Sequence, residues 1–124
     1  RKWLPMPGDA IPNETARQVH DALVNGQIML IDVREPAEFA VERIGGAVLC
    51  PLSTFDTLRL PLEVGKAIVF QCGSGKRSEH AYARAVQAGL SVRGHMGGGI
   101  GAWKAAGLPT LTVDPATGAV QDRK

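Results

Sequence analysis

The sequence has few of the features that mark secreted, membrane-spanning or nucleic-acid-binding proteins. Only two of its 124 residues are cysteines, so the disulfide framework of a small secreted domain is not expected. No apolar stretch approaches the roughly 18 to 20 residues of a membrane-spanning helix, and residues 1–8 lack the apolar core of a secretory signal. No run of five Lys and Arg residues occurs, and the net charge is only +2. We therefore expect neither a membrane nor nucleic acid as a partner, and a reducing, cytoplasmic location.

The overall composition is that of one folded domain. Hydrophobic residues make up 44% of the chain and charged residues 21%, and 124 residues are enough to bury a single core. The fifteen glycines and eight prolines separate apolar runs, so they predict frequent tight turns. After a Pro-rich start, we predict one domain over residues 1–112 and a polar tail or linker over residues 113–124.

Short apolar runs alternate with helical patterns along the chain. Runs that are apolar throughout are typical of strands buried on both faces, as in a parallel sheet covered by helices. The runs predict strands at 28–31, 48–50 and 67–70 and a weaker one at 92–96; the periodicity predicts helices at 14–24 (capped by Asn13), 78–88 and 100–106, with short turns from Pro36 and at 54–60. This alternation favours an α/β fold with a mainly parallel sheet.

A cysteine stands at the end of the third apolar run, just before a helix, where parallel sheets carry their chemistry. Gly73 and Gly75 permit positive φ angles, so we expect successive N–H groups to point into one concavity around the sulfur of Cys72. The helix N-terminus and the charges of Lys76 and Arg77 lower the pKa of a nearby thiol. Such a thiolate attacks an electrophilic sulfur, and the cradle stabilises the resulting persulfide. The candidate site is therefore Cys72 with Gly73, Ser74, Gly75, Lys76, Arg77 and Ser78.

Two other interpretations of this segment compete with a reactive thiol. The simpler one is a buried thiol beside an ordinary glycine-rich turn, but two glycines and two cations within five residues of Cys72 favour a reactive thiol. A nucleotide-binding P-loop is excluded because that motif needs glycine where Phe70 stands and Ser or Thr where Arg77 stands. The second cysteine, Cys50, is predicted to be a buried structural thiol.

Four segments, taken in order, resemble the signatures of the rhodanese family. They are Ile31-Asp32-Val33-Arg34-Glu35 with Glu38-Phe39, Gly46-Ala47 with Pro51, the loop Cys72–Arg77, and Gly97-Gly98 with Ala102-Trp103 and Ala106-Gly107-Leu108-Pro109. The resemblance covers nearly the whole chain. It implies a five-stranded parallel sheet flanked by helices on both faces, with Cys72 as the sulfur acceptor. The chain departs from the family at residues 42–45, Glu-Arg-Ile-Gly, where Gly-His-Ile-Pro is common.

The length of the loop distinguishes activities within this fold. From Cys72 to Arg77 the loop has six positions, which is similar to the sulfurtransferases of the family. The related phosphatases and arsenate reductases have seven, which makes a wider cradle for a tetrahedral oxyanion. The resemblance therefore implies transfer of a sulfane sulfur from a donor such as thiosulfate to cyanide, a thiol or a protein acceptor. A phosphatase or arsenate reductase and a non-catalytic rhodanese-like binding module remain the alternatives.

The remaining polar candidates have structural roles as their first interpretation. Asp32 and Arg34 are predicted to support the site from a strand-end turn, with Glu38 as the local ion-pair partner of Arg34. Ser78 is predicted to cap the helix that follows the loop, or to donate a hydrogen bond to the persulfide. Arg77 is predicted to bridge the loop to a carboxylate such as Asp32.

The histidines and tryptophans offer no further site. His20, His80 and His95 do not lie three or four residues from another His or Cys, so neither a metal nor any other cofactor is predicted. Trp103, on the last predicted helix, is expected to be a core anchor.

Overall fold

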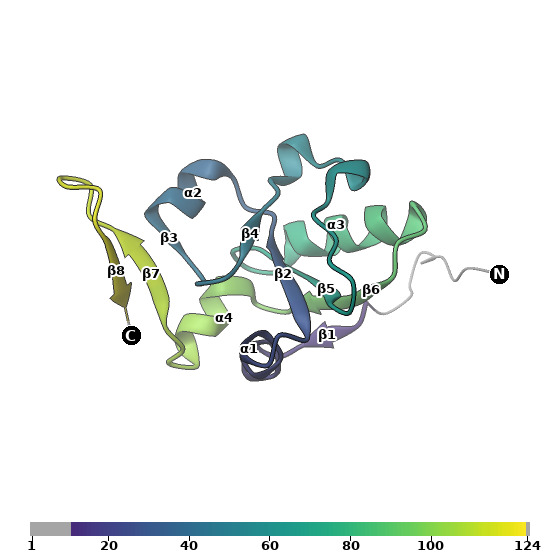
Figure 1. Ribbon diagram of the computed structural model, residues 1–124, viewed down its shortest axis with the longest axis horizontal. Helices are drawn as coiled ribbons and strands as arrows, with labels where there is room; N and C mark the ends of the chain where they lie inside the picture. Colours follow the sequence, from purple (N-terminus) through teal and green to yellow (C-terminus); the bar gives the residue numbers. More distant parts are fainter. Residues whose placement is uncertain (1–10, 124) are drawn as a thin grey trace.

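A computed structural model describes residues 11–123 of the chain, so the Pro-rich start before Ile11, and Lys124 at the end of the predicted tail, lie outside the described residues. The central element is a five-stranded sheet in the order β1-β6-β5-β2-β4, with every pair of neighbours parallel (Figure 1). Its strands are β1 (Asn13–Glu14), β2 (Ile28–Asp32), β4 (Val48–Leu49), β5 (Ala67–Gln71) and β6 (Val92–Met96). The predicted α/β fold with a parallel five-stranded sheet is therefore confirmed.

Helices cover both faces of this sheet. On one face, α1 (Ala16–Val24) and α4 (Gly99–Ala105) pack their apolar side chains against alternate residues of β2 and β5, such as Leu30 and Val69. On the other face, α3 (Lys76–Gln87) packs against Ile31 and Phe70. Leu52, Phe55 and Leu60, from the segment that contains the 3-10 turns Leu52–Thr54 and Thr57–Arg59, pack in the same cluster. Successive side chains of β2 and β5 point to opposite, covered faces of the sheet, which explains why both strands are apolar up to their last residue.

The first helix begins differently from the prediction. Asn13, predicted to be its cap, lies in β1 and pairs in register with His95 of β6. The N-cap is Thr15, whose hydroxyl accepts a hydrogen bond from the backbone N–H of Gln18, while the Gln18 side chain accepts one from the N–H of Thr15. This reciprocal capping box satisfies two N–H groups of the first turn, whereas Asn13 offers one acceptor. The prediction of a helix from Glu14 was therefore two residues early.

A second, three-stranded antiparallel sheet lies beside the first. It contains β3 (Glu42–Arg43), which follows the short helix α2 (Pro36–Val41), and the hairpin of β7 (Thr110–Val113) and β8 (Val120–Arg123). The hairpin stands at the left edge of Figure 1. The prediction of a linker or frayed end after residue 112 was therefore wrong for the described residues, because the β8 backbone pairs along its whole length with β7.

The sequence departure at residues 42–45 coincides with this second sheet. Glu42 pairs with Thr112 and Arg43 with Leu111, so the segment begins as a strand rather than a loop. The Glu42 carboxylate also accepts hydrogen bonds from the Lys104 ammonium, at 2.8 Å, and from the Thr110 hydroxyl, at 2.5 Å. These contacts attach the hairpin to α4.

The helices described between residues 11 and 123 are short. The longest, α3, has 12 residues, and none of the described helices is long and apolar enough to cross a membrane.

Candidate active site

The predicted strand–loop–helix arrangement around Cys72 is present. Strand β5 ends at Gln71, and α3 begins at Lys76 with Gly75 as its N-cap at φ 111°. The helix therefore begins two residues before the predicted Ser78. Gly75 has the positive φ expected for it, but Gly73 does not, so a single left-handed residue makes the turn.

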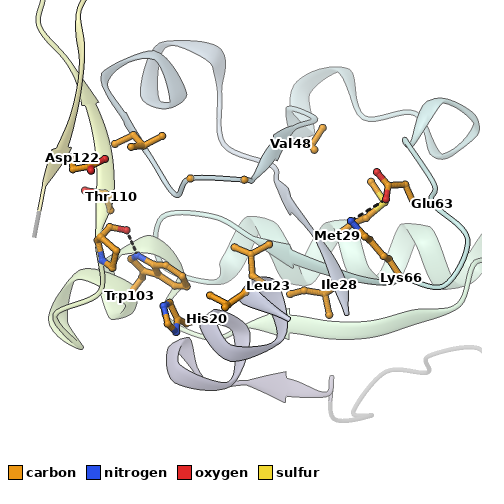
Figure 2. A pocket seen from close by; sticks show the side chains of 15 residues that line it. His20, Leu23, Ile28, Met29, Val48, Glu63, Lys66, Trp103, Thr110 and Asp122 are labelled. Carbon is orange, nitrogen blue, oxygen red and sulfur yellow. Dashed lines mark hydrogen bonds and ion pairs between the residues drawn. The ribbon is translucent and has the colours of Figure 1, made fainter. Parts of the chain in front are cut away.

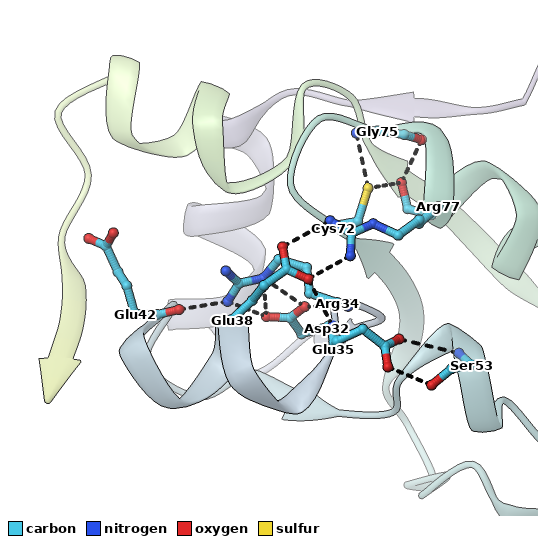
Figure 3. A network of polar contacts seen from close by, with 10 residues as sticks. Asp32, Arg34, Glu35, Glu38, Glu42, Ser53, Cys72, Gly75 and Arg77 are labelled. Carbon is cyan, nitrogen blue, oxygen red and sulfur yellow. Dashed lines mark hydrogen bonds and ion pairs between the residues drawn. The ribbon is translucent and has the colours of Figure 1, made fainter.

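Hydrogen-bond donors of the loop converge on the sulfur. The Gly75 N–H lies 3.0 Å from Cys72 Sγ (Figure 3). Ser78 Oγ lies 3.7 Å from the same sulfur. Burial raises the pKa of the Cys72 thiol, but the N–H and hydroxyl of Ser78 and the N–H groups of Gly75 and Ser74 lower it more. The pKa of Cys72 is therefore lowered from its usual value, and the thiolate is favoured.

Of the two cations of the loop, Arg77 has a different partner from the predicted one. Lys76 is exposed, whereas the guanidinium of Arg77 pairs at both ends with the Glu38 carboxylate, at 2.6 and 3.0 Å, rather than with Asp32. This two-point pairing lowers the pKa of Glu38 to about 2. The hydrogen bonds that Arg77 donates to Glu38 raise the pKa of Arg77, and the charge of the Cys72 thiolate raises it to a smaller extent. Arg77 therefore links the loop to α2.

Asp32 and Arg34 form a buried ion pair at the end of β2. Their side chains are 0% and 6% exposed, and both carboxylate oxygens of Asp32 accept hydrogen bonds from the Arg34 guanidinium at 2.9–3.1 Å. The same guanidinium donates to the backbone carbonyl of Glu42 at 2.7 Å. The predicted pairing of Arg34 with Glu38 was therefore wrong. Arg34 bonds to Asp32 and to the backbone carbonyl of Glu42 at the start of β3, and Glu38 pairs with Arg77.

The glycine-rich start of α4 lies against the Cys72 loop, which the sequence alone did not indicate. The first N–H groups of α4 bond to loop carbonyls: Ile100 N donates to Cys72 O at 2.8 Å, and Gly101 N to Gly73 O at 3.3 Å. A side chain at Gly99, whose φ is +56°, would collide with the carbonyl of Cys72. The N-terminus of α4 thus holds the backbone of the loop in place.

The structure also places His95 in the site, a role that its position in the sequence did not indicate. His95 Nδ1 lies 2.8 Å from Ser78 Oγ, and this hydroxyl also donates to the Gly75 carbonyl at 2.9 Å. Ser78 is thus inside the first turn of α3 and not the cap that was predicted. His95 lies near Cys72 because its strand, β6, is next to β5, the strand that leads to Cys72. A prediction of this strand order would have indicated His95 as a residue of the site.

Other predicted residues lie where packing puts them. Trp103 is 2% exposed, as expected of a core anchor, and its Nε1 donates to Pro109 O at 2.8 Å. Cys50 was predicted to be buried but is half-buried, and burial raises the pKa of its thiol. Between residues 11 and 123, no cluster of three or more His, Cys, Asp or Glu side chains is placed to hold a metal ion.

A cavity of about 650 Å³ lies apart from the Cys72 loop. Side chains from α1, the N-terminal half of β2, α4 and the β7–β8 hairpin line it, among them Leu23, Ile28, Trp103 and Asp122 (Figure 2). Its lining is mainly apolar, and it includes neither Cys72 nor any residue of the loop.

Comparison with known families gives the strand–loop–helix site a context. The profile of the rhodanese-like domain matches residues 15–106, which include both Cys72 and the β6–α4 segment that supports it. The chain belongs to the rhodanese-like domain family. The resemblance carried by the four sequence signatures is thus confirmed.

Relatives of this rhodanese-like domain are mostly longer. It is 44% identical over 84 residues to an uncharacterized protein of Synechocystis, covering 68% of this chain and 47% of that protein. It is 36% identical over 104 residues to the probable adenylyltransferase/sulfurtransferase MoeZ of Mycobacterium tuberculosis, covering 80% and 26%. A sulfurtransferase of Allochromatium vinosum is 34% identical over 84 residues, covering 68% and 78%. The chain thus spans about half of the Synechocystis protein and about a quarter of MoeZ.

Solved structures share the fold of this rhodanese-like domain. The rhodanese-like domain of an Anabaena protein superposes with a TM-score of 0.71 at 26% identity, covering 93% of this chain and 90% of that one. A rhodanese-related protein of Thermoplasma volcanium gives 0.66 at 29% identity, covering 79% and 95%. A Rhodopseudomonas palustris protein of unknown function, described as a possible tyrosine phosphatase, gives 0.67 at 28% identity, covering 80% and 83%.

Proposed function

We propose that this rhodanese-like domain is a sulfurtransferase that carries a sulfane sulfur on Cys72 as a persulfide. The observation that supports the proposal most is the group of polar atoms around the sulfur: the Gly75 N–H donates to Sγ at 3.0 Å, and the Cys72 thiol donates to Ser78 Oγ at 3.7 Å. Donors fixed in place favour a negative charge on the attacking sulfur, and after transfer they favour the anion of the persulfide.

The reaction proceeds in two halves through this intermediate. The Cys72 thiolate attacks the outer sulfur of thiosulfate, the sulfur–sulfur bond of thiosulfate breaks, and sulfite leaves with the bonding electron pair. A thiophilic acceptor such as cyanide or a thiolate then attacks the terminal sulfur of the persulfide, and Cys72 leaves again as a thiolate. A protein thiol is an acceptor of the same chemistry, and a reducing, cytoplasmic compartment suits a site that must return to the thiolate.

Access to the sulfur requires movement of the loop. Cys72 has no exposed surface in the structure, whereas Ser74 and Lys76 of the same loop are exposed. A donor therefore reaches Sγ only when the segment that covers it shifts. In the proposed reaction the ammonium of Lys76 attracts the anionic donor to this segment.

Two other activities compete with this proposal. The first is a phosphatase or arsenate reductase, since the Rhodopseudomonas neighbour is described as a possible tyrosine phosphatase. The loop of six positions from Cys72 to Arg77 argues against it, because a loop of this length favours a single sulfur atom over a tetrahedral oxyanion. A non-catalytic binding module has no need for a thiol with a lowered pKa, so the state of Cys72 argues against it.

Turnover of thiosulfate with cyanide, compared with hydrolysis of an aryl phosphate by the same preparation, distinguishes the three activities. We expect thiosulfate to be turned over much faster, because a phosphoryl group needs more room than the cradle of the Gly75 and Ser78 donors leaves. Robust hydrolysis of the aryl phosphate would favour the phosphatase. No turnover of either substrate by folded protein would favour the binding module.

A further inference from the structure

His95 lies on β6, the strand next to β5, and β5 leads directly to Cys72. It stands in register with Phe70, which is two residues before Cys72, and it is 6% exposed on the face of the sheet that α3 covers. Its Nδ1 is 2.8 Å from Ser78 Oγ, and Ser78 Oγ is 3.7 Å from Cys72 Sγ. A continuous chain of three polar atoms therefore leads from the reacting sulfur to a buried imidazole.

The hydrogen atoms available to this chain allow two arrangements. In the structure the one hydrogen of the Ser78 hydroxyl is donated to the Gly75 carbonyl at 2.9 Å. Once this hydrogen turns away from Gly75, the hydroxyl can both donate and accept, so Ser78 bridges Cys72 and His95 in either direction. When Cys72 is a thiol, its S–H points to Ser78 Oγ. When Cys72 is a thiolate, the Ser78 hydrogen points to the sulfur, and His95 stabilises this orientation by donating from Nδ1 to Ser78 Oγ. The two arrangements differ by the position of one proton at each end of the chain.

We propose that Cys72, Ser78 and His95 form a proton relay in which His95 takes up the proton that Cys72 loses when it becomes a nucleophile. The Cys72 S–H bond breaks as a new O–H bond forms at Ser78, and the original O–H bond of Ser78 breaks as an N–H bond forms at His95 Nδ1. The product is a thiolate beside an imidazolium, with no other reactant consumed. The relay rests on the proposed function for its purpose, but its chemistry concerns these three side chains alone. His95 does not touch the sulfur, so it is a positioning residue that acts through Ser78.

The charges around His95 are compatible with this role. Burial lowers the pKa of His95, and the charge of Glu79 on α3 raises it in part, so the ring is neutral and able to accept a proton at pH 7. The adjacent strand β1 offers Asn13, in register with His95, and Glu14, whose carboxylate is engaged by Arg93 at 2.9 Å. In the proposed relay, the thiolate of Cys72 is the additional negative charge that favours the imidazolium.

The most direct test is an NMR titration of the histidine rings in the whole chain, before and after Cys72 is alkylated with iodoacetamide. Alkylation removes the thiolate, so we expect the pKa of His95 to fall by about one unit, as for directly coupled groups. The exposed His80 is the internal control and should titrate identically in both samples. An unchanged His95 titration would overturn the relay.

Kinetics of alkylation supply a second test. In His95→Asn an amide can still bond to Ser78 but cannot take a proton, so we expect alkylation of Cys72 at pH 6 to slow about tenfold, equivalent to one pKa unit. Ser78→Thr keeps the hydroxyl and should retain the wild-type pH profile, whereas Ser78→Ala should lose it. A His95→Asn profile that superimposes on the wild-type profile would contradict the relay.

The relay and the proposed function fail in different ways in these tests. Iodoacetamide is not a sulfur donor, so both measurements report on the three side chains whether or not sulfur is transferred. Coupled titration of His95 in a protein that takes up no sulfur would contradict the sulfurtransferase and leave the relay standing. Sulfur uptake by a protein in which the titration of His95 is not coupled to Cys72 would support the sulfurtransferase and contradict the relay.

Discussion

Replacement of Cys72 by serine is expected to reduce thiosulfate:cyanide sulfur transfer at least about a thousandfold, the scale seen when a covalent nucleophile is removed. An alcohol ionises far above neutral pH, and its oxygen does not form a counterpart of the persulfide. The Gly75 N–H and the Ser78 hydroxyl would remain in place around the oxygen, so the loss measures the sulfur itself. Steady-state rates with thiosulfate and cyanide check the prediction.

Cys50→Ala is the matched control for this substitution. Cys50 is half-buried and packs against the cluster of buried side chains that contains Cys72. Burial raises the pKa of the Cys50 thiol, so this thiol is less reactive than that of Cys72 at neutral pH. We expect Cys50→Ala to keep most of the activity if circular dichroism shows a native fold. Equal losses in two folded variants would show that Cys72 is not the nucleophile.

Asp32→Ala is expected to lower the free energy of unfolding by about 3 to 5 kcal/mol, the range measured when one partner of a buried ion pair is removed. Asp32 is 0% exposed and accepts four hydrogen bonds of Arg34, one from its backbone and three from its guanidinium. Its removal leaves a guanidinium that is only 6% exposed without a counter-charge. Urea unfolding followed by circular dichroism measures the change.

An exposed ion pair provides the control for Asp32→Ala. Glu63 accepts from the Lys66 ammonium at 3.0 Å, with side chains that are 58% and 36% exposed, so Glu63→Ala should cost less than about 1 kcal/mol. Similar small losses in both variants would show that the pair of Asp32 and Arg34 contributes little. If Asp32→Ala does not fold, a double variant with Arg34→Leu should recover stability, because no buried charge is then left alone.

The parts of the fold that follow from the sequence are those with a strong local pattern. The strands Ile28–Asp32 and Ala67–Gln71 are apolar up to their last residue because both faces are covered, and this pattern is visible without a structure. Strands β3 and β8 could not be predicted in this way. Glu42–Arg43 has two residues, and Val120–Arg123 is exposed along its length, so their pairing depends on contacts between distant segments.

The site shows the same division between local pattern and tertiary contact. The loop from Cys72 and the N-terminus of α3 could be located from glycines and cations alone. The partners of its charges could not, because Arg77 meets Glu38, 39 residues away, through the packing of α2 against the loop. The local expectation that Arg34 pairs with Glu38 failed since Asp32, two residues away, presents both oxygens to the guanidinium inside the core. Likewise, His95 enters the site only through the order of the strands.

The central claim, that Cys72 carries the transferred sulfur, is tested most directly by the intact mass of the protein after incubation with thiosulfate and removal of the excess donor. The account predicts a gain of one sulfur atom per chain, located on the peptide that contains Cys72, absent in Cys72→Ser, present in Cys50→Ala and reversed by cyanide. An unchanged mass in folded wild-type protein, or a sulfur atom found on Cys50 instead, would contradict it.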